Sequence, residues 1–434
     1  MTGSVKSIPY KSEIPLYGSY DVTVLGGGPA GVSAAVSAAR KGARVLLVEA
    51  SPSLGGMATS GLVGPFMTVY DRDGDERTVG GIFSEIVSRL ERYGAVIDPA
   101  EVESPSLYTS FIEKYHRHVT PFHSFYLEIV LDEMVREAGV TLLCYTKFAD
   151  AVTENGAIRY AVLAAPEGLV SVESRVFIDC TGNASVAERA GVPTYKGDEE
   201  CGIPQPGTLM FEVGSVDDAR FDAFGKRPER PVKAYLTPTK GRYKVNHYHV
   251  YNVDATSARS LTDGHSEARR QVLDAYAVLH DKTPGFENAE LLSVAPVLGI
   301  RESRHIEGEY RITVKDVAEG TPFEDSIAVY GFGMDIHNRR STESGNFKIE
   351  VAKRYRIPYR SLLPKGCENL LVAGKTLSCE SQAVGGMRCM PAAMAMGQAA
   401  GIAAATAVEQ EISLRAVDTD ALRRELVSLG AIVD

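Results

Sequence analysis

The sequence predicts an α/β fold in which a Rossmann-like domain is discontinuous along the chain and carries an inserted α+β domain. Three observations support this fold class. Residues 20–49 read as strand, glycine-rich turn, helix, strand and acid. Short apolar runs that end in turns with glycine recur at residues 176–182 and 369–375. The residues between these two blocks contain further strand and helix patterns, which indicates a second domain inserted into the first.

The first strand of this unit is the apolar run 22–25, and it stops at a turn that contains Gly26, Gly28 and Gly31. Gly26 permits the tight turn, Gly28 lets backbone N–H groups approach a pyrophosphate, and Gly31 lets the helix pack close to the strand. The helix N-terminus favours negative charge. Glu49 lies 18 residues beyond Gly31 and is placed to accept hydrogen bonds from ribose hydroxyls. The dinucleotide contacts predicted from this unit are Gly26, Gly28, Pro29, Ala30, Gly31, Glu49 and Ala50.

Composition and charge exclude several classes of function. The chain has 434 residues and a net charge of −10, and it contains no cluster of Lys and Arg that would neutralise nucleic-acid phosphates. Its six cysteines form no CxxC pair, which argues against zinc, an iron–sulfur cluster and a redox dithiol. The N-terminus lacks the apolar core of a signal peptide. Residues 392–408 are apolar but rich in Ala and Gly, so we expect a closely packed core helix rather than a membrane span. These features predict a cytoplasmic protein.

The residues after Glu49 distinguish between the dinucleotides. A glycine pair, Gly55-Gly56, follows six positions later. This pattern resembles the FAD-binding signature of the glutathione-reductase-like flavoproteins, and residues 176–182 resemble their second FAD-contacting motif. Residues 369–375 form a third block, followed by Gly385-Gly386 and a small-residue helix over 391–407. The resemblance implies tightly but noncovalently bound FAD. The further contacts that it implies are Gly55, Gly56, Met57, Ala58, Thr181, Gly182, Gly374, Gly386 and Met387.

More narrowly, the chain resembles FAD-dependent oxidoreductases related to the flavoprotein of fumarate reductase and to the flavin domain of cobalamin-pathway oxidases. The matching stretches are residues 55–61, 178–193, 285–310, 335–338, 357–375 and 387–401. In such an arrangement the N-terminus of the helix that begins near Pro391 points its positive end at the N1–C2=O edge of the flavin.

We expect the three blocks to converge on one cofactor. The expected parts are an irregular N-terminal arm (1–19), an FAD-binding domain (20–70, 123–200 and 356–434), a helical excursion (71–122) and a substrate or capping domain (201–355). Helices are expected over 123–139, near 266–280 and over 419–429, a hairpin turn at 154–156, and a strand over 244–253.

The same resemblance implies that substrate lies between the two domains, with Arg301, His337 and Arg388 facing the flavin. The two arginines would bind a carboxylate or stabilise an enolate. His337 is the candidate general base or acid because its ordinary pKa lies near neutrality. Asp335 could orient it. The alternative is structural, because arginines in turns often form ion pairs with the surrounding chain.

Three further side chains alternate along the expected strand 244–253, namely His247, His249 and Tyr251. On a strand they would share one face, where they could line the substrate side of the second domain or supply two metal ligands. We expect substrate contact and no metal. His116, His118 and His123 are outside candidates for a covalent flavin bond.

The sequence contains no second glycine motif of the dinucleotide-binding kind, so the hydride comes from the substrate or from an external reductant. The leading hypothesis is a dehydrogenase or reductase that transfers a hydride between a small polar substrate and FAD. The alternatives are an oxygen-using flavin oxidase or hydroxylase, and an FAD-binding sensor or assembly protein without turnover. The electron acceptor is left open between oxygen, a quinone and a redox protein. We expect no nucleic-acid partner and no membrane span, and a homo-oligomer is compatible with the sequence.

Overall fold

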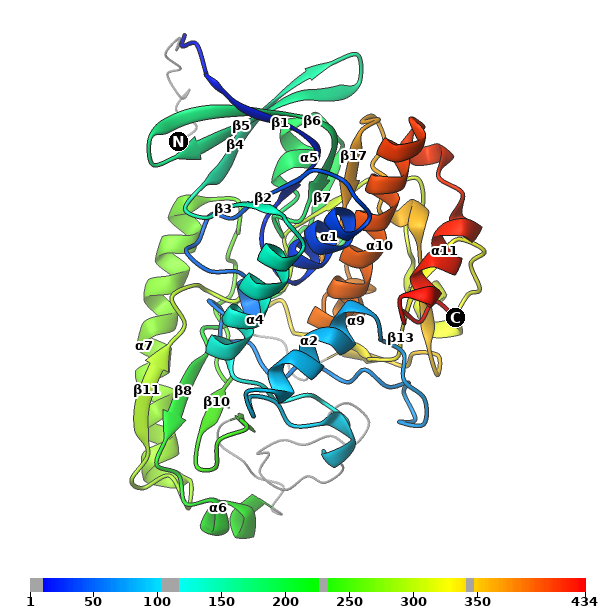
Figure 1. Ribbon diagram of the computed structural model, residues 1–434. Coiled ribbons are helices and arrows are strands. Elements are labelled where there is room, and N and C mark those ends of the chain that lie inside the picture. The colour runs from blue at the N-terminus through cyan, green and yellow to red at the C-terminus, as the bar shows by residue number, and fades with distance from the viewer. Residues whose placement is uncertain (1–10, 103–116, 226–232, 341–346) are drawn as a thin grey trace.

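The computed structural model describes residues 11–102, 117–225, 233–340 and 347–434. Its main feature is a seven-stranded sheet with the order β3-β2-β1-β6-β5-β4, in which β17 also pairs with β6 (Figure 1). The strands of this sheet are β1 (Leu16–Leu25), β2 (Val45–Val48), β3 (Thr141–Leu143), β4 (Lys147–Glu154), β5 (Ala157–Ala165), β6 (Gly168–Asp179) and β17 (Leu370–Val372).

The core of the sheet is parallel. β1 pairs in parallel with β2 and β6, β2 with β3, and β17 with β6. All four residues of β2 are buried, as expected for a parallel strand that is covered on both faces. Residues 16–19, expected in an irregular arm, instead belong to β1, because their backbone pairs with β6 from Leu16 onwards.

Helix α1 (Pro29–Arg40) packs closely against α10 (Met390–Gln410), as Figure 1 shows at the centre of the molecule. A Cβ atom on Gly397 would lie 2.1 Å from the carbonyl oxygen of Ala30, and one on Gly401 would lie 2.2 Å from that of Ala34. Only glycine permits this approach. Helix α10 is long and apolar enough to cross a membrane, but 89% of its most apolar stretch of 18 residues is buried inside the fold. Its small apolar residues therefore allow it to pack closely against α1.

The predicted hairpin is present. β4 and β5 pair antiparallel and are joined at Asn155-Gly156, where both residues have positive φ angles of 50° and 77°. Such angles favour asparagine and glycine and suit a tight hairpin turn. Helix α4 (Ser124–Glu137) and helix α11 (Thr419–Ser428) form where the sequence predicts them.

A second, antiparallel sheet has the order β11-β8-β10-β9 and is covered by the long helix α7. These elements, in green to yellow in Figure 1, lie apart from the large sheet and form the additional α+β domain. The elements are β8 (Phe211–Gly214), β9 (Ala234–Leu236), β10 (Tyr243–Val245), β11 (Glu290–Val294), α6 (Asp218–Gly225) and α7 (Ala258–Lys282).

The prediction of one strand over residues 244–253 is wrong. β10 ends at Val245, and the chain returns to a sheet-like contact only at Val250, which forms an isolated bridge with Gly207. Asn252 has a φ of 58°, which is incompatible with an extended strand. This segment is therefore a loop, and its alternating side chains do not share a strand face.

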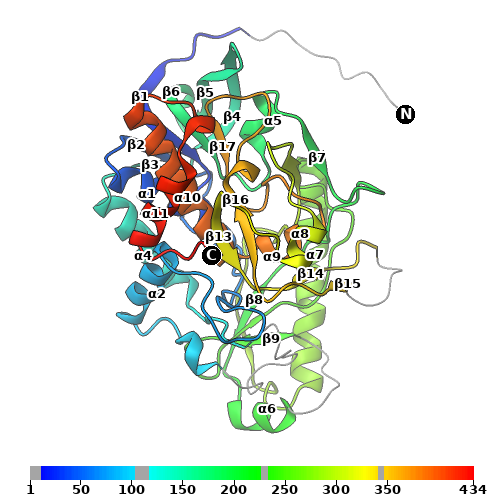
Figure 2. The same ribbon diagram turned by 90° about the vertical axis from the view of Figure 1, so that its right-hand side faces the viewer.

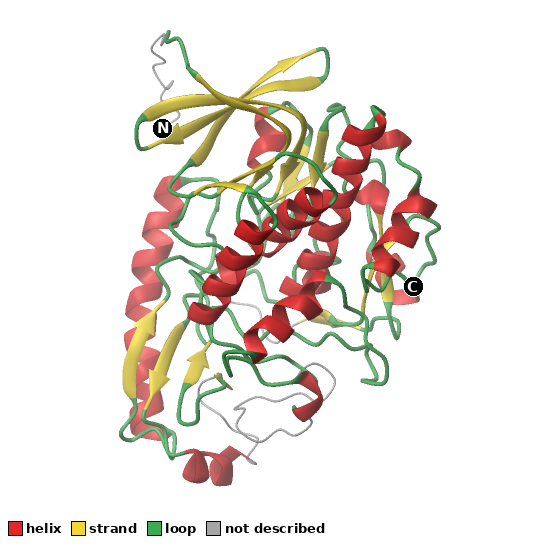
Figure 3. Cartoon of the chain, in the orientation of Figure 1, coloured by secondary structure: helices red, strands yellow, loops and turns green. Residues whose placement is uncertain are grey.

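Short paired strands and helices complete the fold, as Figure 3 shows by secondary structure. The strands are β7 (Thr194–Lys196), β12 (Arg304–Ile306), β13 (Ser326–Tyr330), β14 (Met334–Ile336), β15 (Phe347–Ile349) and β16 (Tyr355–Pro358). The helices are α2 (Ile82–Glu91), α5 (Ser185–Arg189), α8 (Val314–Glu319) and α9 (Val384–Met387). Helix α9 packs beside β14, on the side of the molecule that faces the viewer in Figure 2.

Candidate functional site

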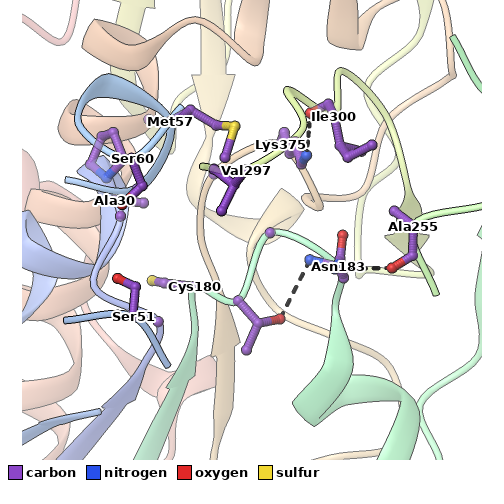
Figure 4. Close-up of a pocket in the computed structure, with 18 of the residues that line it drawn as sticks. Ala30, Ser51, Met57, Ser60, Cys180, Asn183, Ala255, Val297, Ile300 and Lys375 are labelled. Carbon is purple, nitrogen blue, oxygen red and sulfur yellow. Dashed lines mark hydrogen bonds between the residues drawn. The ribbon is translucent and has the colours of Figure 1, made fainter. Parts of the chain in front are cut away.

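A cavity of about 480 Å³ lies where the parallel strands of the large sheet end. The turns after β1, β2, β6 and β17 line it, together with the start of α10 and residues 296–300 of the second domain. Figure 4 shows residues of these segments around the cavity, with Ala30 and Ser51 on one side and Ala255 and Ile300 on the other. Because the carboxyl ends of parallel strands meet at one edge of a sheet, segments far apart in sequence build one site.

Each glycine of the turn after β1 is required at its position for a different structural reason. Gly26 has a φ of 105°, and a Cβ on it would lie 2.4 Å from the carbonyl oxygen of Cys180. A Cβ on Gly31 would lie 1.7 Å from the carbonyl oxygen of Gly26, so the helix approaches the strand too closely for any other residue. A Cβ on Gly28 would meet no protein atom within 4 Å. Gly28 thus leaves an open space at the N-terminus of α1, and this space suits a pyrophosphate.

Glu49 closes the same end of the cavity. Its carboxylate accepts hydrogen bonds from the backbone N–H groups of Gly27 at 2.6 Å and Ser51 at 2.7 Å. Two backbone donors hold the carboxylate in place, and each oxygen has a further lone pair for a ribose hydroxyl. The glycine turn, the helix N-terminus and the fixed acid together fit the adenosine diphosphate half of FAD.

The turn after β6 is held by the buried carboxylate of Asp179. It accepts hydrogen bonds from the backbone and hydroxyl of Thr181 and from the N–H groups of Val186 and Ala187 at the start of α5. This acid fixes Thr181 and Gly182 at the cavity wall.

The structure places the predicted cofactor residues in two groups. Those that line the cavity are Gly26, Gly28, Pro29, Ala30, Glu49, Gly56, Met57, Thr181, Gly182 and Gly374. Those that do not line it are Gly31, Ala50, Gly55, Ala58, Gly386 and Met387. Glycine is required at position 386 by packing instead, since a Cβ there would lie 2.1 Å from the hydroxyl of Tyr355.

Sequence reasoning missed several lining residues. They are Ser51, Ser60, Cys180, Asn183, Ala255, Leu261, His265, Pro296, Val297, Leu298, Ile300, Ala373, Lys375, Met390 and Ala393. Lys375 and Met390 lie within or beside motifs that the sequence singles out. Residues 296–298 and Ile300 lie in the matching stretch 285–310, whereas Ala255, Leu261 and His265 lie outside all of the matching stretches, and tertiary packing brings them to the cavity.

Next to the cavity, Asp335 joins Arg388 to His337. Arg388 lines the cavity, and its Nη2 atom donates to Oδ2 of Asp335 at 3.1 Å and to the backbone oxygen of Asp335 at 3.0 Å. The same Oδ2 atom lies 3.1 Å from Nε2 of His337. His337 follows β14 directly, and it lies on the far side of Asp335 rather than in the cavity wall. Among the described residues, neither Nδ1 of His337 nor Nε of Arg388 has a hydrogen-bond partner, although both atoms are buried.

Arg301 belongs to the same charged group. It is 8% exposed, and its Nη1 atom donates to the carbonyl oxygen of Pro206 and to the hydroxyl of Thr208, both at 2.7 Å. Burial and the nearby Arg388 lower the pKa of Arg301 to about 10, so it stays charged at neutral pH. Arg301 does not line the cavity.

The two other residues of this charged group, His337 and Asp335, have pKa values that are shifted by burial and by the neighbouring charges. Burial and Arg301 lower the pKa of His337 to about 4, although Asp335 opposes this shift. Burial disfavours ionisation of Asp335, but His337 and Arg388 outweigh it and lower the pKa of Asp335. At neutral pH the group therefore holds two guanidinium cations, one carboxylate and a neutral imidazole. Its net charge is positive, and this favours an anionic ligand.

Of the three predicted substrate residues, His249 lies nearest to this group. Its ring centroid is 4.8 Å from that of His337, and burial together with Arg301 lowers its pKa to about 3. The ring centroid of Tyr251 lies 6.1 Å from that of His249 in an edge-to-face arrangement, whereas the ring of His247 is tilted against that of Tyr248, with the centroids 4.2 Å apart. Within the described part of the chain, no three His, Cys, Asp or Glu side chains are grouped to hold a metal ion.

The histidines considered for a covalent flavin bond lie elsewhere. His118 is buried against Pro99 and stacks on Tyr70, and His123 contacts the hydroxyl of Thr239 at 2.8 Å. Neither lines the cavity. His116 lies outside the described residues.

Comparisons with curated proteins agree with a flavin site. The digeranylgeranylglycerophospholipid reductase 2 of Methanothermobacter thermautotrophicus is 28% identical over 206 residues, which are 46% of this chain and 48% of the reductase. The soluble pyridine nucleotide transhydrogenase of a Marinomonas species is 60% identical over 40 residues, 9% of each chain. The chain thus spans less than half of the length of either relative in these alignments.

Solved structures share the fold. The p-nitrophenol 4-monooxygenase of Pseudomonas putida aligns with 96% of this chain and 87% of its own, with a TM-score of 0.50 and 12% identity. CabE, an aromatic hydroxylase of angucycline biosynthesis, aligns with 95% of this chain and 68% of its own, with a TM-score of 0.50 and 15% identity. At these identities the likeness concerns the fold.

The family comparison covers nearly the whole chain. A model of the FAD dependent oxidoreductase family matches residues 21–426, which include every segment that lines the cavity. The predicted fold class, the FAD cofactor and the assignment as an enzyme are confirmed. The glycine turn, the fixed Glu49 and this match lead to one conclusion: the chain belongs to the FAD dependent oxidoreductase family.

Proposed function

We propose that the enzyme transfers a hydride between noncovalently bound FAD and a small polar substrate that carries a carboxylate. The observation that supports this most is the link through Asp335, because it joins an arginine of the cavity wall to a buried histidine. Such a group can bind an anion and move a proton at the same place. The proposed kinship with the glutathione-reductase-like flavoproteins and the fumarate reductase flavoprotein points the same way.

The cofactor would be held at both ends of the cavity. Gly28 and the N-terminus of α1 would hold the pyrophosphate, and Glu49 would accept hydrogen bonds from the adenosine ribose. The start of α10 and Arg388 lie at the other end. When bound, FAD supplies two-electron chemistry by exchanging a hydride with the substrate.

Arg388 would bind the substrate carboxylate from the cavity wall, and the buried Arg301 would add positive charge behind it. Their planar guanidinium groups suit a carboxylate and keep their charge at neutral pH. Arg388 has a buried Nε–H without a partner among the described residues, so a carboxylate would satisfy a donor that the fold leaves open.

His337 would accept, at Nδ1, the one proton that the substrate releases beside the hydride. The carboxylate of Asp335 can only accept a hydrogen bond, so the neutral imidazole carries its hydrogen on Nε2 and leaves the Nδ1 lone pair free. During oxidation one substrate C–H bond would break with its electron pair going to the cofactor. The proton released from the neighbouring O–H, N–H or C–H group would then go to Nδ1, and the reverse reaction would return it.

A substrate screen tests this proposal. Purified holoenzyme is mixed anaerobically with 2-hydroxy acids, amino acids and saturated dicarboxylates, each paired with its neutral amide or alcohol. We expect loss of the flavin absorbance with a carboxylate substrate and much slower loss with its neutral partner. Bleaching by neutral polyols but not by any acid would contradict the anionic substrate.

An oxygen-using oxidase or hydroxylase is the second candidate, and it differs in how the reduced cofactor is reoxidised. Admitting air after anaerobic reduction separates the two. Reoxidation within the turnover time, with hydrogen peroxide or a hydroxylated product, would support the second candidate. Slow reoxidation by oxygen, with fast reoxidation by a quinone or a redox protein, would support a dehydrogenase.

A further inference from the structure

Lys375 is a lysine of the cavity wall to which the proposed mechanism gives no role. It follows Gly374 in the turn after β17, and Gly374 has a φ of 96°. The Nζ atom of Lys375 donates to the carbonyl oxygen of Ile300 at 2.5 Å. Figure 4 shows this bond, by which the side chain reaches from the turn after β17 to the loop of the second domain.

The ammonium group of Lys375 forms no ion pair with any residue that the structure describes. Among the residues that the structure describes, no carboxylate lies within ion-pair distance of its Nζ atom, and its one hydrogen bond goes to a neutral carbonyl. Arg388, the other strong cation of the wall, is paired with Asp335. Burial, and to a smaller extent the charge of Arg388, lower the pKa of Lys375 to about 8, although the more distant carboxylate of Glu302 opposes this shift. A lysine ammonium has three donors, so two remain for a ligand.

The ends of the cavity indicate which part of FAD Lys375 faces. The pyrophosphate and adenosine end is defined by Gly28 and Glu49. Lys375 extends instead toward Ile300, and Arg388 is its strongest charged neighbour. The N-terminus of α10 opens at the same end, where Met390 lines the wall. This is the end left for the isoalloxazine ring system.

We propose that Lys375 stabilises the negative charge that the N1–C2=O edge of the flavin gains on two-electron reduction, and thereby raises the reduction potential of the bound cofactor. When a hydride is added, two electrons and one proton enter the ring system, and the extra negative charge is shared by N1 and the C2 oxygen. A fixed ammonium that forms no ion pair with the described residues favours this form over the oxidised one. This inference goes beyond the proposed function, because it depends on FAD but not on the substrate.

The test compares holoenzymes with Lys375→Met and Lys375→Arg. The midpoint potential is measured by spectroscopic titration against a reference dye, and the affinity for sulfite is measured by absorbance, because sulfite addition to the flavin also places negative charge on this edge. We expect Lys375→Met to lower the ratio of reduced to oxidised flavin at least about tenfold at a given solution potential. For a two-electron couple this corresponds to a midpoint potential that is lower by about 30 mV. Sulfite should bind at least about tenfold more weakly. Lys375→Arg keeps the charge and should retain most of both values.

Lys244 provides a matched control. It is a buried lysine whose pKa burial likewise lowers to about 8, but it donates to the hydroxyl of Ser124 at 2.8 Å and its Nζ atom lies 4.4 Å from the ring centroid of Phe122. It does not line the cavity. We expect Lys244→Met to leave the potential and the sulfite affinity at their original values.

Three results would overturn the inference. An unchanged potential and sulfite affinity in Lys375→Met would remove the electrostatic role. Equal changes of the potential and the sulfite affinity in Lys244→Met would show that the loss of any lysine charge from the fold has this effect. Equal loss of affinity for oxidised and reduced FAD, in Lys375→Met and in a milder Lys375→Gln variant, would place the ammonium at the pyrophosphate instead. None of these measurements requires the substrate, so a failed substrate screen would leave them unaffected.

Discussion

The Nε2 atom of His337 lies 3.1 Å from Oδ2 of Asp335, which also accepts a hydrogen bond from Arg388. The aspartate therefore fixes the tautomer of the histidine and, at the same time, connects it to the cavity wall. A neutral histidine in this position has its basic lone pair on Nδ1, a buried atom without a partner among the described residues.

The first prediction concerns this histidine. His337→Ala should keep the bound FAD and lose about 10²–10⁴-fold in the rate of reduction by substrate, the usual contribution of a general base. Stopped-flow absorbance under anaerobic conditions measures this rate. The matched control is His280→Ala, because His280 also pairs with an aspartate, Asp281, but on the exposed side of α7. A full rate in His337→Ala would remove this residue from the mechanism.

The second prediction concerns pH. The pKa of His337 is about 4, below its ordinary value, so the base is in its active, neutral form above this pH. The rate of flavin reduction should therefore be level near neutral pH and fall as the pH drops through about 4. The profile is measured on the half-reaction, with the FAD content checked at every pH. A rate that instead falls below pH 6.5 would mean that His337 has an unshifted pKa or that another histidine acts.

The third prediction separates cofactor binding from folding. Gly28 has an extended backbone with φ of −71° and ψ of −173°, and a Cβ there meets no protein atom within 4 Å. Gly28→Val should therefore fold normally but purify without the yellow cofactor, because its side chain occupies the space of the pyrophosphate. Gly31→Val is the contrast, since its Cβ would lie 1.7 Å from the carbonyl oxygen of Gly26 and should destabilise the fold itself. Circular dichroism and the flavin-to-protein absorbance ratio distinguish the two. A yellow Gly28→Val protein would disprove the assignment.

The fourth prediction concerns Arg388. Arg388→Met should retain FAD and lower kcat/KM for a carboxylate substrate about 10–100-fold, as expected from the loss of about 1.5–3 kcal/mol for a hydrogen bond to a charged group. Arg388→Lys should recover only part of the loss, because lysine lacks the planar fork. Arg304→Met serves as control, since Arg304 contacts Glu188 and Asn183 and does not line the cavity. Equal losses for acidic and neutral substrates would argue against carboxylate binding.

The fifth prediction concerns stability. Glu302 is 1% exposed and accepts hydrogen bonds from Nη1 of Arg339 at 2.7 Å and from the N–H of Gln205 at 2.9 Å. The side chain of Gln205 in turn accepts from the N–H of His337 at 3.2 Å. Glu302→Gln removes one of the two carboxylates that pair with Arg339, whose Nε atom still lies 2.9 Å from Asp198, so it should lower the free energy of unfolding by about 1.5–3 kcal/mol, as for a hydrogen bond to a charged group.

The same acid gives this stability a pH dependence. Burial opposes ionisation of Glu302, but His305 and Arg339 outweigh it and lower its pKa from 4.5 to about 2. The unfolded chain binds the proton more tightly, so the contribution is complete above pH 4.5 and is lost as the pH falls through about 2. Urea unfolding between pH 5 and 3 should show this slope in the original protein and a weaker one in Glu302→Gln. Glu319→Gln, which changes an exposed acid of α8, should change neither quantity measurably.

The sequence predicts the local parts of this protein well. The glycine turn, the buried run Val45–Val48, the Asn155-Gly156 hairpin and the small-residue helix each carry a signal within a few neighbouring residues, and the structure contains all of them. The loop after Val245 is different. Its side chains alternate as in a strand, but within the described part of the chain only Val250 forms a sheet-like pair, with Gly207.

The charged group beside the cavity could not be assembled from sequence alone. Asp335 and Arg388 lie 53 residues apart, and their contact depends on α9 packing beside β14. Lys375 could be singled out as a lysine after a glycine turn, but its lack of an ion pair among the described residues depends on which carboxylates the fold brings near it.

The close contact between α1 and α10 also bears on the order in which the holoenzyme is assembled. Helix α1, which begins at Pro29, rests on Gly397 and Gly401, and the strand that pairs with β6 in parallel from the C-terminal part of the chain, β17, is made of residues 370–372. When only the first two thirds of these residues have emerged from the ribosome, the glycine turn is present, but α10, the helix that supports α1, has not yet been synthesised. Stable capture of the flavin therefore requires that α10 has emerged from the ribosome and packed against α1.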